Sequence, residues 1–149
     1  MKNLLLIVSV VCLLTAGYTT VNGGDWVYYA ASKGLGDKYY YDETSIFSDA
    51  EGAVRIWIKQ VLSDEGKQRF MESMKQNGYS DTGKLESISY VLNHLAFKCS
   101  TKEYKLISNS VRDATGNVVD SDSPQPTWNP VPPKSIMEIL YKTVCKGRK

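Results

Sequence analysis

A strictly alternating segment, from Ala53 to Leu62, is the strongest structural signal in this sequence. Aliphatic residues at Val54, Ile56 and Ile58 alternate with the longer side chains of Arg55, Trp57 and Lys59. Successive side chains of a β-strand point to opposite faces of a sheet, so the pattern predicts a strand with one buried face. The fold must therefore contain a sheet that is covered on one side.

Further strand signals lie on both sides of this segment. Trp26–Ala31 and Lys38–Asp42 are rich in tyrosine and are separated by glycine-containing turn residues, which predicts a hairpin. Long apolar-rich strands are expected at Leu85–Cys99 and Lys102–Asp113. The turn residues 114–117 then lead into Val118 and Val119 and predict a second, longer hairpin.

Two helices are expected between and after the strands. Ser63–Gly78 is rich in Glu, Lys, Gln and Met and ends in Asn-Gly, which predicts a short helix followed by a polar loop over 79–84. Ser135 and Glu138 have the spacing of a capping box, and an apolar stripe at helical spacing follows up to Val144. The proline-rich stretch 120–134 is expected to lack regular structure. Together these signals predict an α+β fold: an antiparallel sheet of five to six strands with a C-terminal helix packed on one face, plus a short helix inserted between strands.

The first 23 residues have the layout of a secretory signal peptide. Lys2 precedes the apolar run Leu4–Leu14, and as a helix these residues span only ~16 Å, too short to cross a membrane. Cleavage is expected after Gly17 or, preferably, after Gly23, which leaves 24–149 as one domain. Tyr18 stands where a lipidated cysteine would be needed, so the product is expected to be periplasmic or secreted, without a transmembrane segment in the mature chain.

The residues left after cleavage restrict the chemistry. Cys99 and Cys145 are the only two of the three cysteines that survive cleavage, and a pair in an oxidising compartment is most simply a disulfide; catalytic or metal-binding roles are less expected. Without Lys2 the chain has 17 basic and 16 acidic residues, a balance that predicts no nucleic-acid partner. His94, the only histidine, lies in an apolar strand and is expected to be structural. We therefore expect no enzymatic activity, no metal and no cofactor.

The tyrosines are the more informative side chains. We take Tyr28, Tyr39, Tyr40 and Tyr41 as a candidate binding surface, because tyrosine combines contact area with a hydrogen-bonding tip. Alternation places Tyr39 and Tyr41 on one face and Tyr40 on the other. The alternative is that these rings cover sheet edges or pack under the terminal helix.

The order of several short motifs resembles a known family. Trp26 is followed by Tyr41-Asp42-x-x-Ser45-Ile46 and Val54-x-Ile56-Trp57. Later come Cys99, Asp113-x-x-Gly116-x-Val118, Trp128 before prolines, and Cys145 after a helix. This arrangement resembles the surface-adhesin protein E-like domain of bacterial envelope proteins over the mature chain.

The resemblance implies a sheet backed by a helix and a role in binding host matrix and serum proteins. Two departures are Tyr18, where adhesin-type members carry a lipid anchor, and the helical segment 64–77, which looks like an elaboration of this chain. We therefore predict an exported, non-enzymatic protein that binds a macromolecular partner, such as an extracellular or envelope protein, through a tyrosine-rich sheet face. The alternative is a periplasmic accessory or ligand-binding protein.

Overall fold

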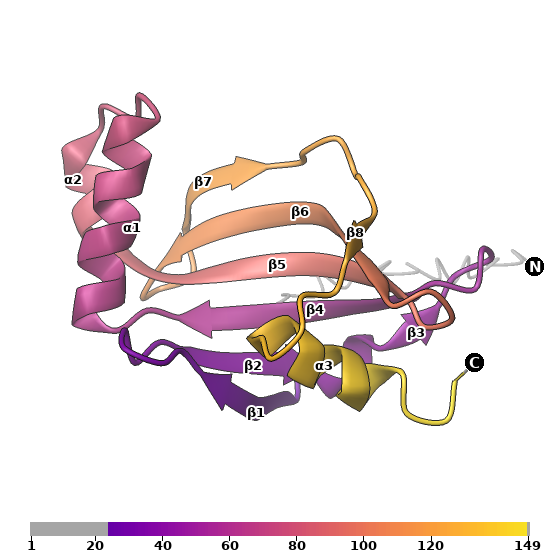
Figure 1. Ribbon diagram of the computed structural model, residues 1–149. Coiled ribbons are helices and arrows are strands. Elements are labelled where there is room, and N and C mark those ends of the chain that lie inside the picture. The colour runs from indigo at the N-terminus through magenta and orange to yellow at the C-terminus, as the bar shows by residue number, and fades with distance from the viewer. Residues whose placement is uncertain (1–23, 149) are drawn as a thin grey trace, which may run out of the picture.

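The alternating segment forms strand β4 in the interior of one antiparallel sheet (Figure 1). The computed structural model describes residues 24–148, and its main strands are arranged in the order β1-β2-β4-β5-β6-β7. Two short strands extend the sheet, β3 beside β4 and β8 beside β6. The elements are β1 (Trp26–Ala31), β2 (Lys38–Asp42), η1 (Glu43–Ser45), β3 (Phe47–Ser48), β4 (Val54–Val61), α1 (Asp64–Gln76), α2 (Thr82–Glu86), β5 (Ile88–Lys98), β6 (Glu103–Asp113), β7 (Val118–Asp122), β8 (Asn129–Pro130) and α3 (Ile136–Val144).

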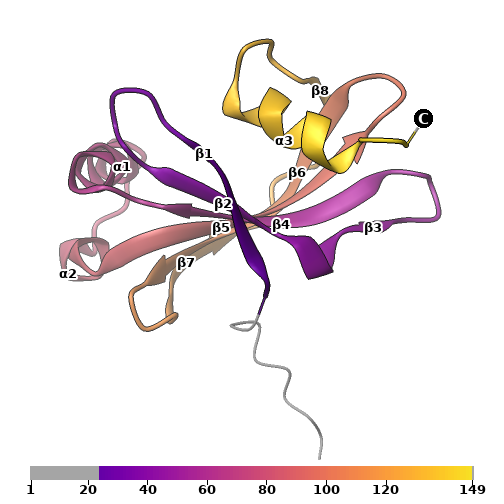
Figure 2. The same cartoon turned by 90° about the horizontal axis from the view of Figure 1, so that it is seen from below.

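The main core lies between the sheet and α3. Three alternate residues of β4, Val54, Ile56 and Ile58, are buried in it. They pack against Leu95 and Phe97 of β5 and against Leu140 and Val144 of α3. Figure 2 shows α3 on one side of the strongly twisted sheet, which we call the helix face. The opposite side, here called the open face, has no helix across its middle in residues 24–148.

Helix α3 is fixed at both ends. At its start, the Ser135 hydroxyl accepts a hydrogen bond from the backbone N–H of Glu138 (3.1 Å), as the capping-box spacing predicted. At its end, Cys145 forms a disulfide with Cys99, which follows β5, and the Tyr141 hydroxyl donates to the carbonyl of Cys99 (2.7 Å). The last element of the chain is thus held against one of the two central strands.

A second core lies near the other end of the sheet. Leu85, Ile88, Val91 and Val111 are buried there beneath apolar residues of α1, which covers this end of the helix face. The expected loop at 79–84 is wrong in part, because α2 begins at Thr82 and β5 begins only at Ile88. The physical reason is local: the Asp81 carboxylate accepts from the N–H of Lys84 (3.2 Å) and caps a helical turn that buries Leu85.

A buried carboxylate joins the β1–β2 turn to the start of α1. Asp37 is 1% exposed and accepts hydrogen bonds from the backbone N–H of Ser63 (2.9 Å), the Ser63 hydroxyl (3.1 Å) and the Gln60 amide (2.9 Å). Gly66 in the first turn of α1 lies so close that a Cβ there would be 1.9 Å from an Asp37 carboxylate oxygen. Glycine is required here by the approach of the carboxylate, not by the backbone conformation.

The predicted fold class is confirmed: the sheet is antiparallel, α3 packs on one face and α1 is inserted between strands. The stretch 120–134 contains the end of β7 and the two-residue strand β8, both of which the sequence analysis missed. The predicted signal peptide lies outside the described residues. No helix within 24–148 has the length and apolar character needed to span a membrane.

Candidate binding surface

The open face carries a group of aromatic and basic side chains. Strand register places Tyr28 opposite Tyr40, Tyr40 opposite Lys59, and Trp57 opposite His94, and paired residues in a sheet present their side chains on the same face. Tyr28 and Tyr40 pack edge to face, with ring centroids 5.7 Å apart. Tyr28 is 55% exposed, although it belongs to a six-residue strand, so an aromatic surface is available to a partner.

The ammonium of Lys59 lies among three aromatic rings of this face. Its Nζ is 4.2 Å from the ring centroid of Trp26, 6.0 Å from that of Tyr40 and 5.8 Å from that of Tyr90. Burial lowers the pKa of Lys59 from its ordinary value. The electron-rich ring faces offset part of this cost by attracting the cation, an effect worth ~0.5–2 kcal/mol. Beside it, Lys59 and Tyr90 line a shallow depression of about 290 Å³ that the β6–β7 turn completes.

His94 occupies the middle of the open face. Its imidazole stacks on Trp57 with a centroid distance of 4.6 Å and an interplanar angle of 9°, and its Nε2 is buried without a hydrogen-bond partner. Burial lowers the pKa of His94, and the positive charge of Arg55 lowers it further. A catalytic base needs an orienting acceptor, usually a carboxylate; the charged neighbour here is a guanidinium, so the arrangement favours a structural imidazole.

A second cluster of aromatic and basic side chains lies further along the same face. Trp128, just before β8, has the ammonium groups of Lys98 and Lys105 at 4.3 and 4.5 Å from its ring centroid. Lys105 is paired in register with Ala96, which is itself paired with Arg55, so these side chains share the open face. Sequence analysis missed this cluster, because Trp128 is separated from both lysines along the chain.

The structure divides the four candidate tyrosines between the two faces. Tyr28 and Tyr40 lie on the open face, whereas Tyr39 and Tyr41 lie on the helix face, where both pack against Tyr29 at centroid distances of 6.2 and 6.1 Å. Strand alternation turns Tyr29, the neighbour of the open-face Tyr28, toward the same side, and the bulge after Tyr28 brings Ala30 opposite Tyr39. Burial raises the pKa of Tyr29 and that of Tyr39. The four tyrosines therefore do not form one surface.

Tyr39 lines a groove on the helix face between α3 and the rest of the sheet. The groove has a volume of about 320 Å³; its floor includes Ile58 and Leu95, and its rim includes Asn93 and Met137. It is a mainly apolar depression with a few amide groups, the usual composition of a small-molecule site.

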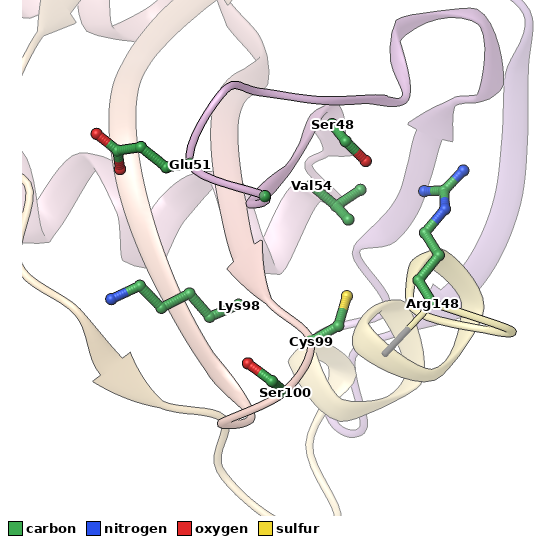
Figure 3. A pocket seen from close by; sticks show the side chains of 8 residues that line it. Ser48, Glu51, Val54, Lys98, Cys99, Ser100 and Arg148 are labelled. Atoms are coloured by element: carbon green, nitrogen blue, oxygen red, sulfur yellow. The ribbon is translucent and has the colours of Figure 1, made fainter.

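A third cavity lies next to the disulfide (Figure 3). It measures about 580 Å³ and is bordered by the β3–β4 connection, the β5–β6 turn and the C-terminal turn. Figure 3 shows Arg148 directed toward Ser48 and Val54, with Glu51 and Lys98 on the opposite side. Its lining combines acidic and basic groups, so it selects no ligand charge.

Comparison with known proteins gives a consistent result. The family model described as Surface-adhesin protein E matches residues 26–146. The structure of Haemophilus influenzae protein E is 14% identical, with a TM-score of 0.52, covering 87% of this chain and 89% of that chain; its selenomethionine form is 13% identical, with a TM-score of 0.52, covering 78% and 84%. At these identities the likeness shows a shared fold. No protein of curated function matches the chain in sequence.

Proposed function

Since this chain belongs to the surface-adhesin protein E family, we propose that it is an exported, non-enzymatic envelope or secreted protein that binds a macromolecular partner through the open face of its sheet. The observation that carries the proposal is the exposed aromatic set on that face. Trp26, Tyr40 and Tyr90 surround one lysine, and Tyr28 packs against Tyr40, where no helix of the described residues covers them. Aromatic residues at the centre of a patch supply most of the binding energy in protein interfaces.

The surroundings of His94 and the character of the open face support a binding role over catalysis. The histidine is stacked on Trp57 and faces a guanidinium, as described above. The open face instead offers area and hydrogen-bonding tips, which suit recognition of a large partner.

The test compares binding by matched variants to a panel of purified extracellular matrix and serum proteins, measured by surface plasmon resonance. We expect Tyr28→Ser combined with Tyr40→Ser to weaken binding at least ~30-fold, from the loss of ~2 kcal/mol or more at one anchor. Ile139→Ser is the control, because Ile139 is 47% exposed on α3, on the other side of the sheet. His94 is no control, since it lies on the open face.

All variants must keep melting temperatures close to that of the parent. Equal binding by the parent and the folded tyrosine variant would contradict the proposal, as would equal weakening by Ile139→Ser.

The groove beside Tyr39 favours a second candidate, a ligand-binding protein of the periplasm. Its apolar floor and amide rim would accept a small amphipathic molecule. Met137→Trp would fill the groove and abolish ligand-induced thermal stabilisation in a screen of small apolar compounds, while leaving macromolecular binding intact. A screen without any stabilising compound would remove this candidate.

A further inference from the structure

The basic residues of the sheet are confined to one side of it. The strands contain six lysines and arginines, and register with neighbouring strands places every one on the open face: Lys38, Arg55, Lys59, Lys98, Lys105 and Arg112. The acidic strand residues Asp113, Asp120 and Asp122 lie on the helix face, and only Asp42 and Glu103 share the open face. The strands of the open face thus carry a formal excess of four positive charges, in a chain whose net charge is +2.

Most of these cations lack an internal counter-charge. Among residues 24–148, the ion pairs comprise Arg55 with Asp49 (2.9 Å) and three pairs on helices or helix ends, so five of the six strand cations have no carboxylate within 4.0 Å. Three of them, Lys59, Lys98 and Lys105, are held instead over tryptophan rings. An aromatic ring positions an ammonium without neutralising it, so the charge remains available to an anion.

One pair of lysines is positioned as an anion site. Lys98 and Lys105 lie 4.3 and 4.5 Å from the same ring centroid of Trp128, which places their ammonium groups within 8.8 Å of each other. Two like charges in this range repel each other, and an anion that contacts both ammonium groups offsets that repulsion. From this pair to the level of Lys59 the face extends six residues along β5, or ~20 Å. A ligand that meets both clusters must be a polymer with repeated negative charges.

We propose that the open face binds a linear sulfated polysaccharide, with Lys98 and Lys105 over Trp128 at one end and Lys59 over Trp26 at the other. The alternative polyanion, single-stranded nucleic acid, is bound by proteins whose free aromatic faces stack with bases. Here the ring of each tryptophan already contacts another side chain. Lys59 lies over Trp26, His94 stacks on Trp57, and two lysines lie over Trp128. The face therefore offers fixed cations, which read sulfate groups, in place of stacking platforms. The inference rests on the proposed function, because it uses the same face of the sheet. A partner protein that carries sulfated polysaccharide chains would fit both proposals.

The test uses heparin as the probe, with the purified protein in isothermal titration calorimetry at two salt concentrations. We expect heparin to bind, with an affinity that falls as salt screens the charges. Combining Lys98→Gln with Lys105→Gln should weaken binding at least tenfold, and Lys59→Gln should weaken it further. The combination Lys33→Gln with Lys75→Gln is the charge-matched control, since both are exposed and lie outside the sheet strands; its affinity should stay within twofold.

Several outcomes would overturn the proposal. These are no heparin binding by the folded parent, equal loss in the control, equal binding of neutral dextran, or single-stranded DNA of similar charge binding as tightly as heparin. The result is separable from that of the proposed function. If the parent does not bind heparin, and the parent and the lysine variants still bind matrix or serum proteins, this inference is refuted and the proposed function stands.

Discussion

Gly66→Ala is the sharpest test of how α1 is attached to the sheet. In an ordinary helix interior this change adds helix propensity and stabilises by ~1 kcal/mol. Here the new Cβ would lie 1.9 Å from an Asp37 carboxylate oxygen and 2.7 Å from its carboxyl carbon, so the carboxylate or the helix must move. Asp37 is buried and holds the backbone N–H of Ser63, so either movement disturbs a hydrogen bond to a charged group.

The expected magnitude follows from three contributions. Overpacking of a filled site costs ~1–3 kcal/mol, and loss of a hydrogen bond to a charged group costs ~1.5–3 kcal/mol. Subtracting the propensity gain of ~1 kcal/mol leaves a net loss of about 1.5–5 kcal/mol. For a domain of this size, such a loss lowers the melting temperature by on the order of 10 °C.

The assay is urea unfolding followed by circular dichroism, with Gly83→Ala as the matched control. A Cβ at Gly83 of α2 would lie an ordinary 3.7 Å from an Asp81 carboxylate oxygen, so this variant should be neutral or more stable than the parent. In an Asp37→Ala background, Gly66→Ala should lose most of its cost, because the clash has been removed. Stabilisation by Gly66→Ala in the parent, or an unchanged cost in the Asp37→Ala background, would refute the reasoning.

Three further outcomes are expected. Replacing Cys99 and Cys145 by serine should lower the free energy of unfolding by up to ~4 kcal/mol, because the bridge joins residues 46 apart; an unchanged urea midpoint would contradict this. Ser135→Ala should lower it by ~1 kcal/mol through loss of the α3 cap, and a midpoint equal to that of the parent would count against the cap. The pKa of His94 is lowered from 6.5 by burial and by Arg55, so the folded state binds a proton less readily than the unfolded chain. Stability should therefore fall as the pH drops through ~6.5, and His94→Phe should remove that part of the slope between pH 7 and pH 5; a variant that keeps the parent's slope would show that another group is responsible.

Local patterns predicted the elements whose stability is mostly local. The alternation in β4, the turn before Val118 and the Ser135 cap were all readable, because each depends on neighbours within a few residues. Helix α2 was missed, because its five residues form one turn that is stabilised by burying Leu85 in the second core. The bulge between Tyr28 and Ala30 could not be predicted either, because it is defined by how β1 pairs with Tyr39 and Tyr40 of the next strand.

The charge distribution was hidden by averaging. A net charge near zero argued against a nucleic-acid partner and indicated no anionic ligand, yet the plane of the sheet separates the strand cations from three of the five strand acids. The placement of two of the cations could be predicted from the sequence, since Arg55 and Lys59 alternate in β4 on the same side as Trp57. The association of Lys98 and Lys105 with Trp128 could not, because it depends on how the proline-rich stretch returns to β6.

The positions of the tryptophans make the open face observable without a label. The sequence contains three tryptophans, and Trp26, Trp57 and Trp128 all lie on this face or at its margin, each against a cation or an imidazole. Contact with a ligand there changes the surroundings of every strong ultraviolet emitter in the protein, whereas occupation of the groove beside Tyr39 reaches none of them directly. Intrinsic fluorescence should therefore distinguish which side of the sheet is engaged, with the unmodified protein as its own reporter.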